Sequence, residues 1–391
     1  MTVDGIQRVT VLGAGNMGHG IAEVTAIAGY DVTLRDIERE YVEKGHGQIQ
    51  WSLEKLESKG KLDESAADIL DRIDLAVDIE KAVAEADLVI EAAPERLSIK
   101  EDIFTDLTEY APADAILATN TSSLSITQIA KVVDNPSRVV GLHFFNPPVK
   151  MPLVEVIYGE ETSEDTATTA ADFVESIDKT PIYVRKDVNG FVVNSVLGPF
   201  LDEPAWMVSE EAGTVRDIDA TMVYERGYPM GPFELSDMTG IDISHSVREE
   251  AGKPIAPAMQ ERVDAEEYGR KSGKGWYDYE NGGADYTEAD VSGDVDTLRI
   301  EARMVNEAAK LIDQAVSIPN EIDTGMKLGA GFPEGPCARA DEIGLDVVLD
   351  SLRDHYERTD ADRFEPSPYL VSLVEDGKTG KAAGEGFYTY E

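Results

Sequence analysis

The segment Gly13-Ala-Gly-Asn-Met-Gly18 has the glycine spacing of a strand–helix turn that can hold a dinucleotide pyrophosphate. An apolar run before it predicts a buried strand, and an apolar helix is expected from about residue 18 to 28. The first glycine permits the tight turn, the second lets backbone approach phosphate, and the third allows close packing, while the helix N-terminus favours an anion. The alternative is a glycine-rich turn without a ligand. The predicted cofactor contacts are Gly13, Gly15, Asn16, Met17 and Gly18.

An acidic residue, Asp36, ends the second predicted strand about 20 residues after the glycines. A carboxylate there accepts hydrogen bonds from a ribose 2′-OH and repels a 2′-phosphate, which favours NAD over NADP. The neighbouring Arg35 could attract that phosphate, but adjacent strand residues point to opposite faces, so only one of the two can reach the ribose. We expect Asp36 to be that residue, the alternative being an ordinary acid at a strand end.

A histidine and a glutamate, His143 and Glu155, are the candidates for acid–base chemistry. Oxidation of an alcohol needs a base that takes the hydroxyl proton as hydride leaves carbon, and imidazole suits that task near neutral pH. A carboxylate against the other ring nitrogen orients the imidazole and stabilises its charged form. Among the five histidines, only His143 ends a predicted strand with an acid in an adjoining strand. A structural role is the alternative for any histidine taken singly.

Strand-like and helical stretches alternate as far as about residue 187. This alternation predicts an α/β domain with a parallel, doubly wound sheet of the Rossmann type over residues 1–187. A long polar helix is expected over about residues 38–58. The strand-like runs are residues 8–12, 31–36, 88–90, 116–118, 139–142, 154–157 and 182–184.

The rest of the chain reads as helices and contains an internal repeat. Residues 219–232 resemble residues 323–336, and residues 236–242 resemble 340–346, both at an offset of 104. The two copies also end alike, in Lys271-Ser-Gly-Lys-Gly-Trp-Tyr and in a similar segment that begins at Lys378. We therefore predict an all-α part in two tandem repeats, residues 188–282 and 296–391, joined by a short acidic linker.

Several motifs together resemble the L-3-hydroxyacyl-CoA dehydrogenase family. They are Ser122, His143-Phe-Phe-Asn-Pro, Glu155, residues 188–194, Tyr228-Pro-Met-Gly-Pro and the Lys271 segment. The resemblance covers about residues 6 to 280, and the second repeat resembles the extra helical repeat of longer members. It implies reversible, NAD-dependent oxidation of an L-3-hydroxyacyl-CoA, such as 3-hydroxybutyryl-CoA, to the 3-oxoacyl-CoA, a reaction of fatty acid metabolism and β-oxidation.

The resemblance also implies roles for individual residues. His143 would be the general base, Glu155 its partner, and Ser122 and Asn194 would hydrogen-bond the substrate oxygen or the histidine. The implied cofactor contacts are Asn146, Glu95, Lys100 and Lys271, and the implied coenzyme A contacts are Ser52 and Lys59. Ordinary surface positions on helices are the alternative for Glu95, Lys100, Ser52 and Lys59. Charge favours Lys59 and Lys100, because a very acidic protein that binds a polyanionic acyl-CoA needs local cations.

Two features depart from the family pattern. Pro199 and Pro204 fall within the helix expected after Asn194 and predict a kink or break there. Leu298 stands opposite Asn194 at the offset of 104, without a glycine fingerprint or a histidine motif nearby. We therefore expect one active site and a structural second repeat. Members with one helical domain dimerise through it, so the second repeat could replace that partner in a monomer, the alternative being a homodimer.

Composition restricts the remaining possibilities. The 391 residues carry a net charge of −42, which disfavours binding to nucleic acid or anionic membranes. The single cysteine, Cys337, excludes a disulfide framework and cysteine-based metal centres, and no metal is expected. Neither a bilayer-spanning apolar run nor a signal peptide is evident, so we expect a cytoplasmic enzyme. The alternatives are a dehydrogenase of a free hydroxy or sugar acid and a catalytically silent cofactor-binding protein.

The acidic excess favours adaptation to a salty cytoplasm over a merely solubilising surface. We expect the thermal midpoint of unfolding to fall as KCl is lowered from about 3 M to about 0.05 M, because the Debye length grows several-fold and the carboxylates repel one another. A thermal melt at each salt concentration checks this, and equal midpoints would contradict it.

Overall fold

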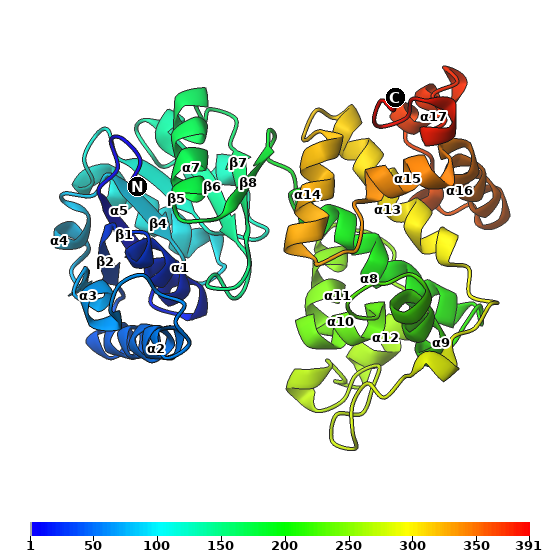
Figure 1. Ribbon diagram of the computed structural model, residues 1–391, viewed down its shortest axis with the longest axis horizontal. Helices are drawn as coiled ribbons and strands as arrows, with labels where there is room; N and C mark the ends of the chain where they lie inside the picture. The colour runs from blue at the N-terminus through cyan, green and yellow to red at the C-terminus, as the bar shows by residue number, and fades with distance from the viewer. Residues whose placement is uncertain (1) are drawn as a thin grey trace. The chain divides into compact units, whose positions relative to one another are not determined.

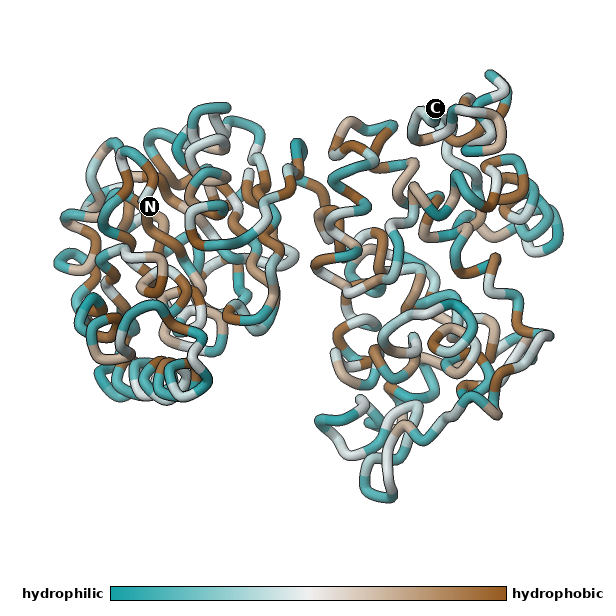
Figure 2. The backbone as a smooth tube through the Cα atoms, viewed as in Figure 1, coloured by the Kyte–Doolittle hydropathy of each residue, from teal (hydrophilic) through white to brown (hydrophobic). Residues whose placement is uncertain are grey.

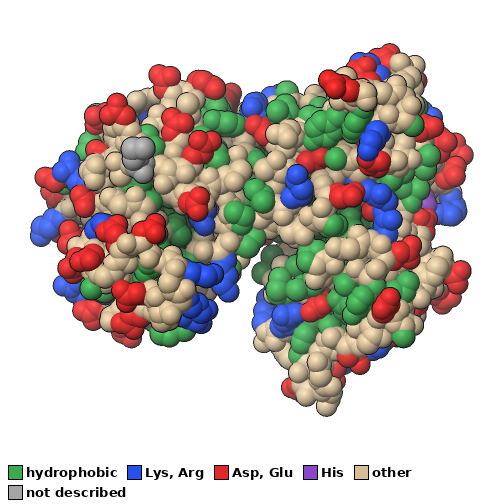
Figure 3. Space-filling model, in the orientation of Figure 1, with side chains coloured by type: hydrophobic (Ala, Val, Ile, Leu, Met, Phe, Trp, Pro, Cys, Tyr) green, Lys and Arg blue, Asp and Glu red, His purple; other side chains and the backbone are tan. Residues whose placement is uncertain are grey.

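The computed structural model describes residues 2–391, which form two compact units (Figure 1). Met1, at which the first predicted domain begins, lies outside the described residues. Unit 1 contains the chain up to Val192 together with Ala315–Ser317, and unit 2 contains Val193–Gln314 and Ile318–Glu391. No helix among the described residues is long and apolar enough to cross a membrane. Acidic side chains are scattered over the visible face of both units (Figure 3).

Unit 1 is built on one eight-stranded sheet with the order β3-β2-β1-β4-β5-β6-β7-β8. Every neighbouring pair is parallel except β6 and β7. The predicted α/β sheet domain is confirmed, but the short edge strand β3, which alternates polar and apolar residues, escaped prediction. The strands are β1 (Arg8–Leu12), β2 (Asp31–Arg35), β3 (Ile73–Ala76), β4 (Leu88–Glu91), β5 (Ile116–Thr119), β6 (Val139–Phe144), β7 (Leu153–Tyr158) and β8 (Thr180–Val184).

Helices cover both faces of this sheet. Residues of α1, α2 and α7 share one apolar core with the strands. Among the other helices, α4 packs against α5, and α5 packs against α6. The tube in Figure 2 is hydrophobic along much of the sheet and mostly hydrophilic along α2. The helices are α1 (Asn16–Ile27), α2 (Arg39–Glu57), α3 (Ala66–Leu70), α4 (Ile79–Val83), α5 (Leu97–Tyr110), α6 (Ile126–Ala130), η1 (Pro136–Arg138) and α7 (Glu164–Ser176).

The strand order reverses between β1 and β4, next to each other at the centre of the sheet. In open α/β sheets, ligands bind beyond the carboxyl ends of the strands at such a reversal. The glycine-rich turn follows β1, Asp36 follows β2, and Ser122 follows β5. The topology therefore gathers predicted site residues at one edge of the sheet.

Unit 2 is helical, as predicted for the C-terminal part of the chain. The first predicted repeat contains α8 (Val193–Ser209), α9 (Val215–Ala220), the π-helical η2 (Thr221–Glu225), α10 (Pro232–Thr239), α11 (Ile241–Glu250), α12 (Pro257–Asp264) and η3 (Arg270–Ser272). After η4 (Glu288–Asp290) come α13 (Thr297–Asp313), α14 (Pro319–Gly329), α15 (Pro336–Ile343), α16 (Leu345–Thr359), η5 (Asp362–Phe364), α17 (Pro368–Glu375) and η6 (Lys381–Ala383).

A kink or a break was predicted in the helix after Asn194, and the break is wrong, because α8 is one helix that contains both Pro199 and Pro204. Both prolines are buried, and α8 packs against α10, α12, α13 and α14. A proline inside a helix costs about 3 kcal/mol, an amount that burial of a central helix on several sides can exceed.

Equivalent aspartates make equivalent contacts in the two repeats. The Asp219 carboxylate accepts the N–H groups of Phe233 and Glu234 and the Tyr277 hydroxyl. The Asp323 carboxylate likewise accepts two N–H groups at the start of α15 and the hydroxyl of Tyr388. Each aspartate thus caps the next helix and ties it to the end of its repeat.

A buried ion network joins α8 of the first repeat to α13 of the second. Glu203, which is completely buried, accepts hydrogen bonds from Arg299 at 2.6 Å, Arg303 at 2.5 Å and Arg363 at 3.1 Å. Its neighbour Asp202 accepts another from Arg303 at 2.8 Å. These carboxylates compensate arginines that would otherwise be buried charges without partners.

We expect Glu203→Gln to lower the free energy of unfolding by about 3 kcal/mol or more, because removing one partner of a buried ion pair leaves uncompensated charge. Denaturant unfolding of the full chain measures this loss. Glu210→Gln is the matched control, since Glu210 also binds Arg299 and Arg363 but its side chain is 36% exposed. Equal losses in both variants would contradict the importance of burial.

Candidate active site

The glycine-rich turn after β1 has the geometry that phosphate binding needs. Gly13 has φ +106°, and a Cβ there would lie 2.5 Å from the Ala92 carbonyl oxygen. A Cβ on Gly18 would lie 1.8 Å from the Gly13 carbonyl oxygen, so only glycine allows this close packing. A Cβ on Gly15 would meet nothing within 4 Å, and no side chain among the described residues caps α1. The start of α1 therefore fits an anionic group such as a pyrophosphate.

The Asp36 carboxylate lies directly beside this turn. One oxygen accepts the Ala14 N–H at 2.7 Å and the other accepts the Ile37 N–H at 2.7 Å. The guanidinium of Arg35 instead donates to the Val77 carbonyl at 2.9 Å, at the end of β3. Of these two neighbours, the acid is the one placed at the turn, which fits a ribose that follows a bound pyrophosphate.

His143 and Glu155 face each other across the antiparallel pair β6 and β7, whose register places them opposite. His143 Nδ1 and Glu155 Oε2 are 2.6 Å apart, and the carboxylate is completely buried. The second carboxylate oxygen accepts the Val192 N–H at 3.0 Å. The imidazole is 7% exposed and lies against Phe145 and Phe191, with ring centroids 4.6 and 5.8 Å away. No described residue hydrogen-bonds Nε2, so this nitrogen can exchange a proton with a ligand.

Glu95 organises the loop that carries Ser122. Its Oε1 accepts the Thr121 hydroxyl at 2.6 Å and the N–H groups of Ser122 and Ser123 at 2.8 and 3.1 Å. Burial would raise the pKa of this carboxyl, but these hydrogen bonds and the charge of Lys100 lower it below its usual value. Glu95 is therefore a loop anchor as well as a predicted cofactor contact.

Lys100 is not the free surface cation that the charge argument assumed. Its side chain is 1% exposed, and Nζ lies 2.8 and 3.0 Å from the two oxygens of Glu91. Glu91 also accepts the Thr119 hydroxyl at 2.6 Å. The expectation that Lys100 offers a local cation to acyl-CoA is wrong, because this buried carboxylate already neutralises it. Its place in the cofactor site stays a prediction, now through the Glu91–Glu95 cluster.

The remaining predicted residues of unit 1 lie at or beyond the ends of its elements or on α2. Ser52 is half-buried on α2, Lys59 is exposed just after it, and Asn146 is exposed after β6. Sequence reasoning missed Glu23 of α1, which packs against α2 and is 1% exposed. Burial raises the pKa of Glu23 to about 7, an effect that nearby Ser52 reduces. The sequence signal that could have identified Glu23 is the presence of a carboxylate within the apolar stretch that forms α1.

Asn194 and Lys271 belong to unit 2, so the geometry described above does not include them. Asn194 is the second residue of α8 and is exposed. Lys271 lies in η3, and its Nζ is 2.6 Å from the Asp242 carboxylate.

Comparison with known proteins agrees with this architecture. The model of the 3-hydroxyacyl-CoA dehydrogenase NAD-binding domain matches residues 8–188. The model of the C-terminal domain of the same family matches residues 190–279 and again residues 297–390. The family models therefore cover most of the chain.

Individual relatives carry related names. A probable 3-hydroxybutyryl-CoA dehydrogenase of Deinococcus radiodurans is 39% identical over 276 residues, 69% of this chain and 99% of that protein. The 3-hydroxyadipyl-CoA dehydrogenase of Escherichia coli is 31% identical and is matched over 95% of this chain and 98% of its own length. A crystal structure of 3-hydroxybutyryl-CoA dehydrogenase from Escherichia coli superposes with a TM-score of 0.88 and 30% identity, covering 95% of this chain and 99% of that one. This chain is an NAD-dependent oxidoreductase that belongs to the 3-hydroxyacyl-CoA dehydrogenase family.

Proposed function

We propose that this enzyme reversibly oxidises an L-3-hydroxyacyl-CoA, such as 3-hydroxybutyryl-CoA, to the corresponding 3-oxoacyl-CoA. The observation that carries the proposal is the 2.6 Å contact between His143 Nδ1 and the buried carboxylate of Glu155. NAD, when bound, accepts the hydride that leaves C3 of the substrate. The protein must supply a base for the hydroxyl proton and hold the reacting atoms in line.

His143 is the proposed base, and Nε2 is the nitrogen that takes the proton. With Nδ1 hydrogen-bonded to Glu155, the neutral ring keeps its lone pair on Nε2, and the carboxylate stabilises the positive charge that develops. Phe145 and Phe191 pack around the ring and limit the access of water to it. In the reverse direction the same imidazolium returns the proton to the 3-oxo group.

The other predicted residues are proposed to bind and orient the substrate and NAD. Ser122 would hydrogen-bond the substrate oxygen from a loop that Glu95 holds, and Asn194 would do so from α8. The glycine-rich turn and Asp36 would hold the pyrophosphate and the adenosine ribose of NAD. Asn146, Glu95 and Lys271 are proposed as further cofactor contacts. Lys100 is a positioning residue in this scheme, because its ammonium is held by Glu91.

Ser52 and the exposed Lys59 are proposed to contact the coenzyme A portion of the substrate. The two stretches of unit 2 are proposed to be copies of one domain, the second having a structural role and covering the first. The chain is proposed to act as a monomer or a homodimer. Its proposed location is a salt-rich cytoplasm. The matching contacts of Asp219 and Asp323 support the duplication.

We expect His143→Gln to reduce turnover of acetoacetyl-CoA by about 10²–10⁴-fold with little change in NADH affinity, because the ring acts on the proton in the transition state. Glu155→Gln should cause a smaller loss and move the falling limb of the pH profile of this reduction to lower pH, because a neutral amide no longer favours the imidazolium that returns the proton. NADH absorbance across a pH series measures both. Normal turnover of His143→Gln would refute the base, and an unchanged profile of Glu155→Gln would refute the pair.

Lys59→Ala tests recognition of coenzyme A. We expect a several-fold higher KM for acetoacetyl-CoA and an unchanged kcat, because the lost cation contributes uniform binding to a phosphate-bearing group. Acetoacetyl-pantetheine, which lacks the nucleotide, should be turned over equally by the variant and the parent enzyme. Lys61→Ala, which removes an exposed cation two residues away, is the control. A KM that rises equally for both substrates would contradict the assignment.

A further inference from the structure

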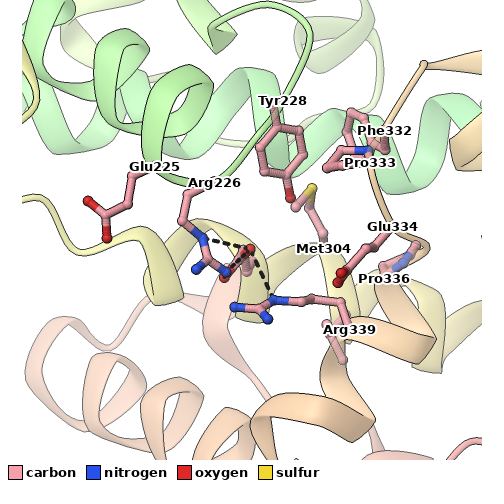
Figure 4. A pocket seen from close by; sticks show the side chains of 11 residues that line it. Glu225, Arg226, Tyr228, Met304, Phe332, Pro333, Glu334, Pro336 and Arg339 are labelled. Carbon is pink, nitrogen blue, oxygen red and sulfur yellow. Dashed lines mark hydrogen bonds and ion pairs between the residues drawn. The ribbon is translucent and has the colours of Figure 1, made fainter. Parts of the chain in front are cut away.

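A cavity of about 240 Å³ lies within unit 2, where the segment after η2 meets α13, α15 and the loop before α15. Figure 4 shows Tyr228, Met304 and two arginines directed into it. Its volume is below the roughly 300 Å³ at which binding sites for drug-sized ligands begin, so only a small molecule fits. The lining residues are Glu225, Arg226, Tyr228, Glu301, Met304, Val305, Phe332, Pro333, Glu334, Pro336 and Arg339.

Tyr228 supplies a hydrogen-bond donor that has no partner among the described residues. Its side chain is 7% exposed, and its ring packs edge-on against Phe332 with centroids 4.8 Å apart. Burial and the charge of Glu301 raise the pKa of Tyr228 above its usual value, so the hydroxyl keeps its proton. A buried hydroxyl without a partner costs free energy that a ligand oxygen or water in the cavity would recover.

The cavity also contains one guanidinium, that of Arg339, whose N–H groups are not all paired with a carboxylate. Arg226 engages Glu301 through both carboxylate oxygens at 2.7 Å. Arg339 Nε is 3.7 Å from the same carboxylate, and no described residue hydrogen-bonds the two Nη atoms of Arg339. These three residues carry a net charge of +1 together. Glu334 also lines the cavity, and Figure 4 shows its carboxylate directed toward it, but this side chain is exposed, so water screens its charge. The Glu225 carboxylate is directed away from Arg339 in the same view.

The internal repeat provides a comparison within the same chain. At the offset of 104, four polar residues of the cavity correspond to apolar residues in the other sequence repeat. The packing of the repeat therefore does not require the polar groups, since apolar residues serve at the same positions. The corresponding pairs are Tyr228 with Phe332, Arg226 with Ala330, Glu301 with Leu197, and Arg339 with Leu235.

We propose that this cavity binds a small monocarboxylate with an apolar body. The available groups, the Arg339 guanidinium and the Tyr228 hydroxyl, are both donors, so the ligand must bring acceptor oxygens and negative charge. Met304, Val305 and Phe332 form an apolar wall that fits a short aliphatic chain or a single ring. Inorganic phosphate would satisfy the donors but leave that wall without a partner.

Isothermal titration of the full chain with hexanoate tests the proposal. We expect saturable binding that Arg339→Leu weakens at least about tenfold and Tyr228→Phe weakens about three- to tenfold. Both variants introduce the residue that the other repeat already carries at that position, so they should fold. Arg353→Gln, at an exposed position of α16, and His143→Gln should bind like the parent chain.

Hexanol and inorganic phosphate serve as the two partial ligands, and each should bind at least about tenfold more weakly than hexanoate. Hexanoate binding that Arg339→Leu leaves unchanged, or that His143→Gln abolishes, would overturn the proposal, as would no saturable binding to the parent chain. The dehydrogenase proposal does not depend on any of these outcomes.

Discussion

The contact between His143 and Glu155 depends on the register of one antiparallel strand pair. Side chains alternate between the faces of a sheet, so a shift of one residue between β6 and β7 would carry Glu155 to the opposite face. The fully buried carboxylate has two partners, the imidazole and the Val192 N–H, which offset the cost of its burial. Because Val192 is the last residue before α8, this pair ties the sheet to the end of the first stretch of unit 1. The same carboxylate is therefore both a structural anchor and the proposed partner of the base.

Buried ion pairs occur in both units of this acidic protein. Lys100 is matched by Glu91 in unit 1, and Glu203 and Asp202 are matched by four arginines in unit 2. Basic residues are scarce, 35 against 77 acids, and a few of them, such as Lys100 and Arg303, are buried in these clusters. Any polyanionic ligand must then rely on the small number of exposed cations near its site, of which Lys59 is the proposed one.

Unit 2 combines contacts that occur in both repeats with contacts that occur in one. Asp219 and Asp323 each cap a helix and bind a tyrosine hydroxyl, so their roles follow from the repeated motif. The Glu203 network and the cavity beside Glu301 have no such counterpart, because they lie where one repeat packs on the other. The two stretches of similar sequence occupy unequal environments, and residues where they meet can therefore differ without disturbing the helices.

Local patterns were sufficient for the features that depend on neighbours in sequence: the glycine turn from Gly13 to Gly18, the strands rich in apolar residues, and the acid at position 36. The sequence repeat was found by comparing stretches 104 residues apart. The sequence order of the motifs also pointed to the family and to His143 with Glu155, although their catalytic roles stay predictions. Only the tertiary structure decided that Lys100 is buried against Glu91, that Glu23 is enclosed between α1 and α2, that α8 continues through two prolines, and that Tyr228 and Arg339 share a cavity. Burial and ion pairing are set by residues distant in sequence, and a local sequence pattern does not identify those distant residues.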